Sequence, residues 1–179
     1  IGGKYGCSGS TTSFLEVTND PSSSVSAYYL YGGNSQSDYL GCFGGSCANT
    51  ATDSICNSVG SYGSNVSATS IWNTVGSYGS TVGTYSPWNS VSSNPPEFFN
   101  QDKSSSYGKF TVNTATANRT TVSSLTSIID YFNNNSQDIG ATRTNACSSE
   151  TAFTQASQRS LLKTNRTSIN VSKDVSTAQ

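Results

Sequence analysis

A tetrapeptide recurs three times in the middle of the chain: residues 54–57 read SICN, residues 70–73 read SIWN and residues 86–89 read SPWN. The copies are sixteen residues apart, and the hexapeptide VGSYGS lies in both intervals. Self-similarity at a fixed period marks a repeated supersecondary unit, and glycine permits tight turns and close backbone approach. We therefore predict a module of stacked turns over about residues 54–91, with its Ile and Trp positions packed inward.

Four aromatic residues of this module have two interpretations: Trp72, Trp88, Tyr62 and Tyr78. Large aromatic side chains dominate small cores, and this favours packing. Exposed aromatic rings also stack on ligands, so a carbohydrate site on these residues is the alternative. A phosphate-binding loop is excluded, because no copy has the Gly-Lys-Ser/Thr ending that such a loop requires.

Two hairpins are predicted on either side of the module. Apolar runs at 25–31 and 39–43 are joined by a connection rich in Gly, Asn and Ser, and this pattern is typical of a β-hairpin. Residues 97–100 and 108–113 form a second pair of runs around a polar loop. In the last run Phe110 and Val112 alternate with polar residues, as in a half-buried strand.

A helix is predicted over about residues 121–132, where Val122, Leu125, Ile128, Ile129 and Phe132 share one helical face. Thr120 or Thr121 could cap its start, and the asparagines at 133–135 could end it.

Further along, residues 149–162 form a weaker helical stretch, and residues 168–175 alternate like a strand. The sequence thus predicts an α+β fold: mainly β-hairpins and a short turn-rich repeat module with one packed helix. The predicted organisation is an extended N-terminal arm at 1–27, a compact domain at 28–135 and a C-terminal segment at 136–179.

The composition predicts a polar surface with few charges. The 179 residues are 33% hydrophobic and 11% charged, with a net charge of −1, whereas a soluble domain has about 25% charged residues. Serine and threonine make up about a third of the chain. Neither nucleic acid nor an anionic membrane is an expected partner, because both attract basic surfaces. Aromatic residues reach 11%, which argues against a wholly disordered chain.

Five cysteines are candidates for disulfides: Cys7, Cys42, Cys47, Cys56 and Cys147. The odd count leaves one thiol free or paired with another chain, and the spacing does not decide the pairing. A metal site is the rival interpretation, but the chain has no histidine and zinc sites usually take four Cys or His ligands. We expect structural disulfides, no metal and no cofactor.

No catalytic centre is predicted. Ser-His-Asp and Cys-His arrangements need a histidine, which the chain lacks. Its ten acidic residues are scattered and form no motif for paired-carboxylate chemistry. The expected modification is N-glycosylation, because Asn-x-Ser/Thr acceptors occur at Asn65, Asn118, Asn134, Asn165 and Asn170.

The predicted location is extracellular or at a cell surface. No apolar stretch reaches the roughly 18 residues that span a bilayer. The chain contains no methionine, so we expect either a processed form from which a leader has been removed or a partial chain. Disulfides suit the oxidising compartment that export implies.

Several motifs together resemble a family of small, uncharacterised, secreted bacterial proteins. The resemblance covers about residues 28–132. It rests on LYGG at 30–33, YLGC at 39–42, DSICN at 53–57, SIWN at 70–73, YSPWN at 85–89, PP at 95–96 and YGKFTVN at 107–113. It implies a hairpin, a repeat block, a second hairpin and a helix, with no assigned activity. Where such proteins often carry Tyr and Lys between the glycines, this chain has Val and Ser, so a role that needs surface charge is in doubt.

The leading functional expectation is a structural, glycosylated protomer of an extracellular fibril, pilus-like filament or sheath. Low charge, dense hydroxyls and strand-like arms suggest self-association into a homopolymer, because an arm can add to a neighbour's sheet edge. A secreted carbohydrate-binding module is the alternative, and a secreted hydrolase has least support.

Overall fold

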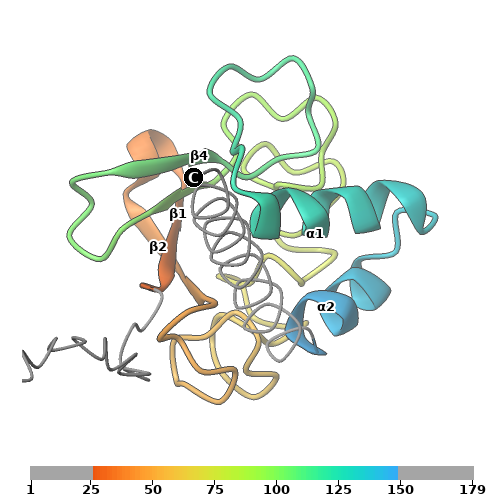
Figure 1. Ribbon diagram of the computed structural model, residues 1–179. Coiled ribbons are helices and arrows are strands. Elements are labelled where there is room, and N and C mark those ends of the chain that lie inside the picture. Colours follow the sequence, from red (N-terminus) through yellow and green to blue (C-terminus); the bar gives the residue numbers. More distant parts are fainter. Residues whose placement is uncertain (1–25, 149–179) are drawn as a thin grey trace, which may run out of the picture.

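The apolar runs on either side of the repeats meet in one antiparallel sheet. A computed structural model describes residues 26–148 of the chain (Figure 1). Its strands are β1 (Tyr28–Gly32), β2 (Asp38–Phe43), β3 (Glu97–Phe99) and β4 (Ser106–Lys109), in the order β2-β1-β3-β4. The predicted α+β class, with two hairpins and a packed helix, is confirmed. The predicted helix at 149–162, the strand at 168–175 and residues 1–25 of the predicted arm lie outside the described residues.

The repeat block leaves the sheet after β2 and returns at β3. Strand β1 pairs with β2 on one side and with β3 on the other, and Leu30 lies opposite Phe98. These two side chains are fully buried. Their neighbours along the two strands, Tyr29, Tyr31 and Phe99, are half-buried. This alternation separates an inner apolar face from an outer aromatic face.

The second hairpin is shorter at one end than predicted. Strand β4 ends at Lys109, while the apolar alternation continues to residue 113. After Lys109 the chain turns to the repeat block: the Phe110 N–H donates to Pro96 O at 2.8 Å, and the Val112 N–H donates to Pro87 O at 2.8 Å. Phe110, Thr111 and Val112 are all buried, so the prediction of a half-buried strand in this run is wrong.

Each repeat copy is a chain of turns held by side chains that bond to the backbone. In the second copy, the hydroxyl of Ser70 accepts from the Trp72 N–H at 3.1 Å, and the Asn73 side-chain amide donates to Ser67 O at 3.0 Å. The equivalent bonds recur in the first and third copies. Serine and asparagine hold turns in this way by replacing backbone partners, so their period is the period of the structure.

The two tryptophans connect successive copies. The Trp72 indole N–H donates to Ile55 O and the Trp88 indole N–H donates to Ile71 O, each at 2.6 Å. Their rings are stacked with centroids 5.4 Å apart, and each side chain is 2% exposed. The prediction that the Ile and Trp positions pack inward is confirmed.

Other segments close both ends of this ladder. At the start, the Ile55 N–H donates to Cys42 O and the Cys42 N–H donates to Asp53 O, which joins the first copy to β2. At the other end, Pro87 O receives the backbone N–H of Val112 in place of the indole of a fourth copy. Terminal repeats need such caps because their faces have no neighbouring copy.

Two helices complete the described part of the chain. Helix α1 (Ser123–Asn134) buries Leu125, Ile128, Ile129 and Phe132, as its period predicts, and the Phe132 ring lies 5.0 Å from that of Trp88. Its N-cap is Val122, without a side-chain bond, so the predicted threonine cap is wrong. The hydroxyl of Thr120 instead accepts from the N–H of Val122, the N-cap residue itself, at 3.3 Å.

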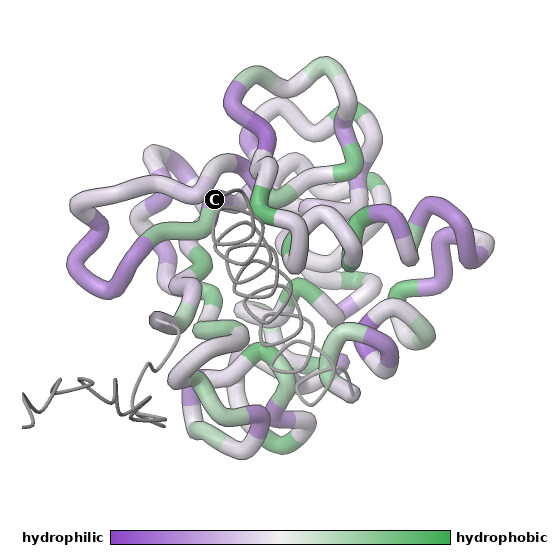
Figure 2. The backbone as a smooth tube through the Cα atoms, viewed as in Figure 1, coloured by the Kyte–Doolittle hydropathy of each residue, from purple (hydrophilic) through white to green (hydrophobic). Residues whose placement is uncertain are grey.

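Helix α2 (Ile139–Ser148) was not predicted. It packs against α1 and buries Ile139, Thr142 and Ala146. In Figure 2, hydrophobic residues form short stretches separated by residues of intermediate hydropathy. Few residues of α2 are strongly hydrophobic. A helix with so weak an apolar face depends on tertiary contacts and not on its own sequence pattern.

Glycines allow the chain within the first two copies to fold back closely on its own repeat asparagine. A Cβ atom at Gly79 would lie 2.3 Å from Asn73 O, whereas one at Gly140 in α2 would meet nothing closer than 3.3 Å.

We predict that Gly79→Ala lowers the free energy of unfolding by about 1–3 kcal/mol, because the backbone must shift. Gly140→Ala is the matched control and should raise it by about 0.5–1 kcal/mol. Urea unfolding followed by tryptophan fluorescence measures both, and an unchanged Gly79→Ala variant would refute the packing.

Candidate functional site

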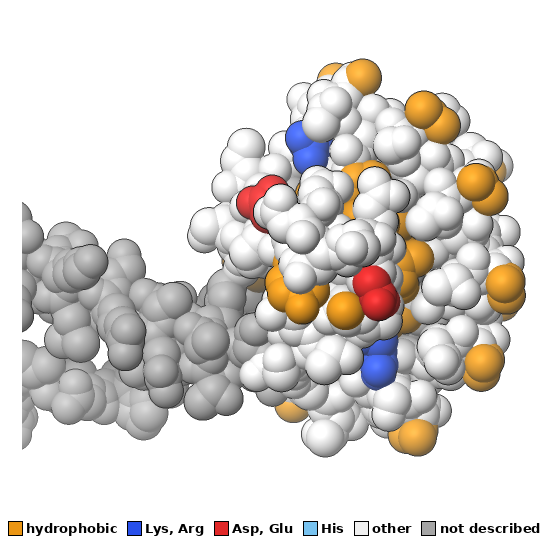
Figure 3. All heavy atoms as spheres, turned by 90° about the vertical axis from the view of Figure 1, so that its right-hand side faces the viewer, with side chains coloured by type: hydrophobic (Ala, Val, Ile, Leu, Met, Phe, Trp, Pro, Cys, Tyr) orange, Lys and Arg blue, Asp and Glu red, His pale blue; other side chains and the backbone are white. Residues whose placement is uncertain are grey.

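The outward side of the repeat block carries exposed valines. The large hydrophobic side chains exposed among the described residues are Val59, Val66, Val75, Val82 and Val91, each 79–92% exposed. In Figure 3, hydrophobic side chains follow one another at intervals along the rim, separated by uncharged polar surface. We refer to the turns around these five residues as the valine-bearing turns.

Local hydrogen bonds hold these valines outward. The N–H groups of Val59, Val75 and Val91 donate to the side-chain oxygen of the repeat asparagine two residues earlier, at 3.0–3.2 Å. The N–H groups of Val66 and Val82 donate to the hydroxyls of Ser64 and Ser80. The same turns that point tryptophan inward therefore point valine into solvent.

The valine-bearing turns themselves carry no charged residue. From Ser54 to Pro96 the sequence contains no Asp, Glu, Lys or Arg. An interface built on this surface depends on apolar burial and on hydroxyl and amide hydrogen bonds. Long-range electrostatic attraction to a charged partner has no source here.

Tyr62 and Tyr78 face the first hairpin. The Tyr39 ring packs edge-on against that of Tyr62 with centroids 5.1 Å apart, and the Tyr39 hydroxyl donates to the Asp53 carboxylate at 2.9 Å. The Tyr78 hydroxyl donates to the Asp38 carboxylate. These contacts attach the repeats to β2, so both repeat tyrosines have a structural role.

Two of these tyrosines have a raised pKa. Burial is the main cause for Tyr39, and the hydrogen bond to Asp53 adds to it. Burial likewise raises the pKa of Tyr78, with a second contribution from the bond to Asp38. The same bond, followed by one from Ser37, lowers the pKa of Asp38. At neutral pH both phenols are therefore protonated and act as hydrogen-bond donors.

The outer face of the sheet is aromatic. The rings of Tyr31 and Tyr39 lie 5.2 Å apart, and those of Tyr31 and Phe99 lie 5.9 Å apart. Lys103 crosses this face: its ammonium lies 4.1 Å from the Tyr31 ring centroid and donates to Gln36 O at 2.9 Å. Cation–π contact with two rings fixes this lysine over the sheet.

The predicted ligand-stacking residues Trp72 and Trp88 are not available to a ligand. Both indoles are buried and their N–H groups are already bonded to backbone carbonyls. The core interpretation of the two tryptophans is therefore the one the structure supports. Half-buried aromatic residues lie instead on the sheet, among them Tyr29 and Tyr31 on β1 and Phe99 on β3.

Four of the five cysteines form disulfides. Cys42 is bonded to Cys47, and Cys56 to Cys147, while Cys7 lies outside the described residues. Cys56 occupies the Trp position of the first copy, and its bond ties the repeat block to helix α2. The sulfur atoms of Cys42 and Cys47 lie within 4.8 Å of an Asp53 carboxylate oxygen, but sulfurs bonded to each other are not thiolate ligands for a metal.

Three of the predicted glycosylation acceptors lie on the described surface. Asn65, Asn118 and Asn134 are all exposed, so each is accessible to a modifying enzyme. Asn65 directly precedes Val66 in a valine-bearing turn. Asn165 and Asn170 lie outside the described residues.

The exposed valines are the feature that sequence reasoning missed. They recur with the same sixteen-residue period as the tryptophans, so the signal was present. An apolar residue inside a predicted core module is ordinarily assigned to the core, and only the turn geometry shows which way it points.

Three comparisons with known proteins found no match for the chain. No family model, no curated protein and no solved structure matches it. Within residues 26–148, neither helix is long and apolar enough to cross a membrane.

The two disulfides should contribute unequally to stability. They join residues 91 and 5 positions apart, and loop entropy grows with the length of the closed loop. Replacing Cys56 and Cys147 together by Ser should lower the free energy of unfolding by about 4–5 kcal/mol, and the Cys42/Cys47 pair by about 2 kcal/mol. Urea titration of the two double variants tests this, and equal losses would contradict the loop argument.

The bond between Tyr78 and Asp38 should be visible in a pH titration. Because the folded-state pKa of Asp38 is lowered, its contribution to stability is present above the ordinary carboxyl pKa of about 3.9 and lost as pH falls through the folded value. In Tyr78→Phe we expect the Asp38 pKa to rise toward that ordinary value, measured by NMR of the carboxyl carbon. Tyr85→Phe, which removes a bond to Asn34 instead, is the control and should leave the pKa unchanged.

Proposed function

We propose that the protein is a structural, extracellular or surface-attached protein that self-associates through its valine-bearing turns. The observation that carries this proposal is the regular series of five valines, each 79–92% exposed on turns fixed by hydrogen bonds. Exposed valine is unfavourable in water, and full burial of each such side chain contributes about 1.5 kcal/mol or more. Several that are buried together would support a specific contact.

A second copy of the chain is the partner that the surface favours. The charge-free run from Ser54 to Pro96 offers no complement to a charged partner, and a net charge of −1 leaves little repulsion between copies. Because the turns repeat, one copy can offer another the same valine spacing that it presents itself. Contacts of this kind that do not close into a ring produce filaments.

Two further features support a role outside the cell. Both disulfides of the described residues close structural contacts, as is common in proteins of oxidising compartments. Exposed Asn65, Asn118 and Asn134 are acceptors whose glycans would solubilise a surface with few charges. A filament, pilus-like fibre or sheath remains the assembly that we propose.

The test is a triple variant, Val59→Thr, Val75→Thr and Val91→Thr. Threonine keeps the shape of valine but replaces a methyl by a hydroxyl, so it weakens apolar burial without removing the side chain. We expect self-association to weaken by about 100-fold, which corresponds to about 1 kcal/mol for each site. Sedimentation equilibrium of the full chain measures this, with negative-stain microscopy to identify filaments.

A surface control separates association from folding. Thr74→Ser, Thr81→Ser and Ser90→Thr change exposed hydroxyl residues of the same turns and should leave association unchanged. The free energy of unfolding of both triple variants should stay within about 1 kcal/mol of the parent, because exposed side chains contribute little to it. A parent chain that is monomeric at millimolar concentration would refute the proposal.

A further inference from the structure

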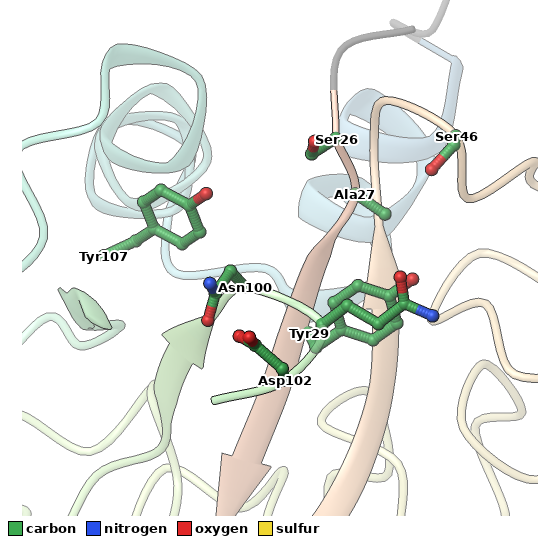
Figure 4. A pocket seen from close by; sticks show the side chains of 8 residues that line it. Ser26, Ala27, Tyr29, Ser46, Asn100, Asp102 and Tyr107 are labelled. Carbon is green, nitrogen blue, oxygen red and sulfur yellow. The ribbon is translucent and has the colours of Figure 1, made fainter. Parts of the chain in front are cut away.

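An open hollow lies where β1 begins. Its volume is about 570 Å³, and its lining includes Tyr29, Asn100, Asp102 and Tyr107, with Ser26 and Ser46 at the edge (Figure 4). Sites for small ligands have volumes of about 300–1,000 Å³ and place a few polar groups beside aromatic surface. The hollow lies within this range of volume and has two tyrosines, but most of its lining is polar. None of its lining residues belongs to the repeat block.

Two rings in the hollow are held in place by other aromatic residues. Tyr29 lies on the outer face of β1, and its ring centroid is 6.5 Å from that of Tyr39. Tyr107 packs edge-on against Tyr28 at 4.9 Å. Tyr29 and Tyr107 are each half-buried, so part of each ring stays accessible. Rings fixed in this way bind a flat apolar surface with little loss of side-chain entropy.

The polar side of the hollow comes from the loop between β3 and β4. The Asp102 carboxylate accepts from the N–H and the hydroxyl of Ser104 at 3.1 and 2.7 Å, and these bonds lower its pKa. Asn100 bonds to Ser104 and to the Ser105 N–H. The loop thus presents an ionised carboxylate in a fixed position, between Asn100 and Tyr29 in Figure 4.

The charge of the hollow limits the kinds of ligand that it can bind. Asp102 is an acidic lining residue, and no lysine or arginine lines the hollow among the described residues. Lys103, the next residue, holds its ammonium over Tyr31 and bonds it to Gln36 O. An anionic ligand would meet the Asp102 carboxylate without a cation to compensate it. A ligand rich in hydroxyl donors satisfies a carboxylate through charge-assisted hydrogen bonds.

We propose that this hollow binds a neutral oligosaccharide. One sugar ring lies with its C–H face on Tyr29, and its hydroxyls donate to the Asp102 carboxylate. This site is separate from the valine-bearing turns, so glycan binding and self-association can fail independently. It also moves the carbohydrate site from the buried tryptophans, where the repeat pattern suggested it, to the tyrosines of the sheet.

The experiment is isothermal titration calorimetry of the full chain with three soluble probes. These are a hexasaccharide of β-1,4-linked glucose, a hexasaccharide of α-1,4-linked glucose and an oligomer of galacturonic acid. We expect at least one neutral probe to bind, and the acidic probe to bind at least about tenfold more weakly. Absence of binding by both neutral probes, or equal binding of the acidic one, overturns the proposal.

Variants then test the residues. Tyr29→Ala should lower the affinity for the neutral probe by about tenfold or more. Tyr29→Phe, which keeps the ring, should keep the affinity within about threefold of the parent. Asp102→Asn on its exposed loop should weaken binding by about threefold or more. Tyr131→Ala on α1, outside the hollow, is the control. If Tyr29→Ala does not fold, Asp102→Asn decides the outcome, and its unchanged affinity would overturn the proposal.

Discussion

The hydrogen bond from each tryptophan indole to a carbonyl of the preceding copy is the interaction on which the rest of the fold depends. Trp72 and Trp88 reach back to Ile55 and Ile71, and their stacked rings fill the space between copies. The turns form neither helix nor strand, so no backbone ladder connects one copy to the next. The indoles supply both the polar link and the apolar contact that such a ladder would otherwise provide.

The sheet and the helices complete this core. Phe110 lies 5.5 Å from Trp88 on one side and Phe132 lies 5.0 Å from it on another, so the sheet-side segment and α1 meet on the same indole. The disulfide from Cys56 adds a covalent tie to α2 at the other end of the ladder. Because the core is built inward from the turns, the outward positions are free to carry valine without affecting the fold.

Much of this architecture is predictable from the sequence, and the exceptions have physical causes. The inward tryptophans, both hairpins and α1 follow from period and turn chemistry, since each has a strong local pattern. Helix α2 has no such pattern, and its position depends on α1 and on Cys147. The path of residues 110–113 is decided by Pro96 and Pro87, far away in the sequence.

The candidate sites were less predictable than the fold. The repeat tryptophans were candidates for ligand stacking because residue type does not reveal exposure, and the valines were missed for the same reason. The hollow beside Tyr29 brings together β1, the loop after β2 and the loop after β3. Only the order of strands in the sheet puts these segments side by side, and no local motif encodes that order.

Hydrogen exchange of the two indole N–H groups, followed by NMR in the full chain, tests the repeat frame most directly. If the ladder organises the fold, both indoles exchange only through global unfolding, and their exchange free energies equal those of the slowest backbone amides. Exchange of either indole at the rate of an exposed tryptophan would show that the copies are not joined in this way. The account of inward tryptophans and outward valines would then be wrong.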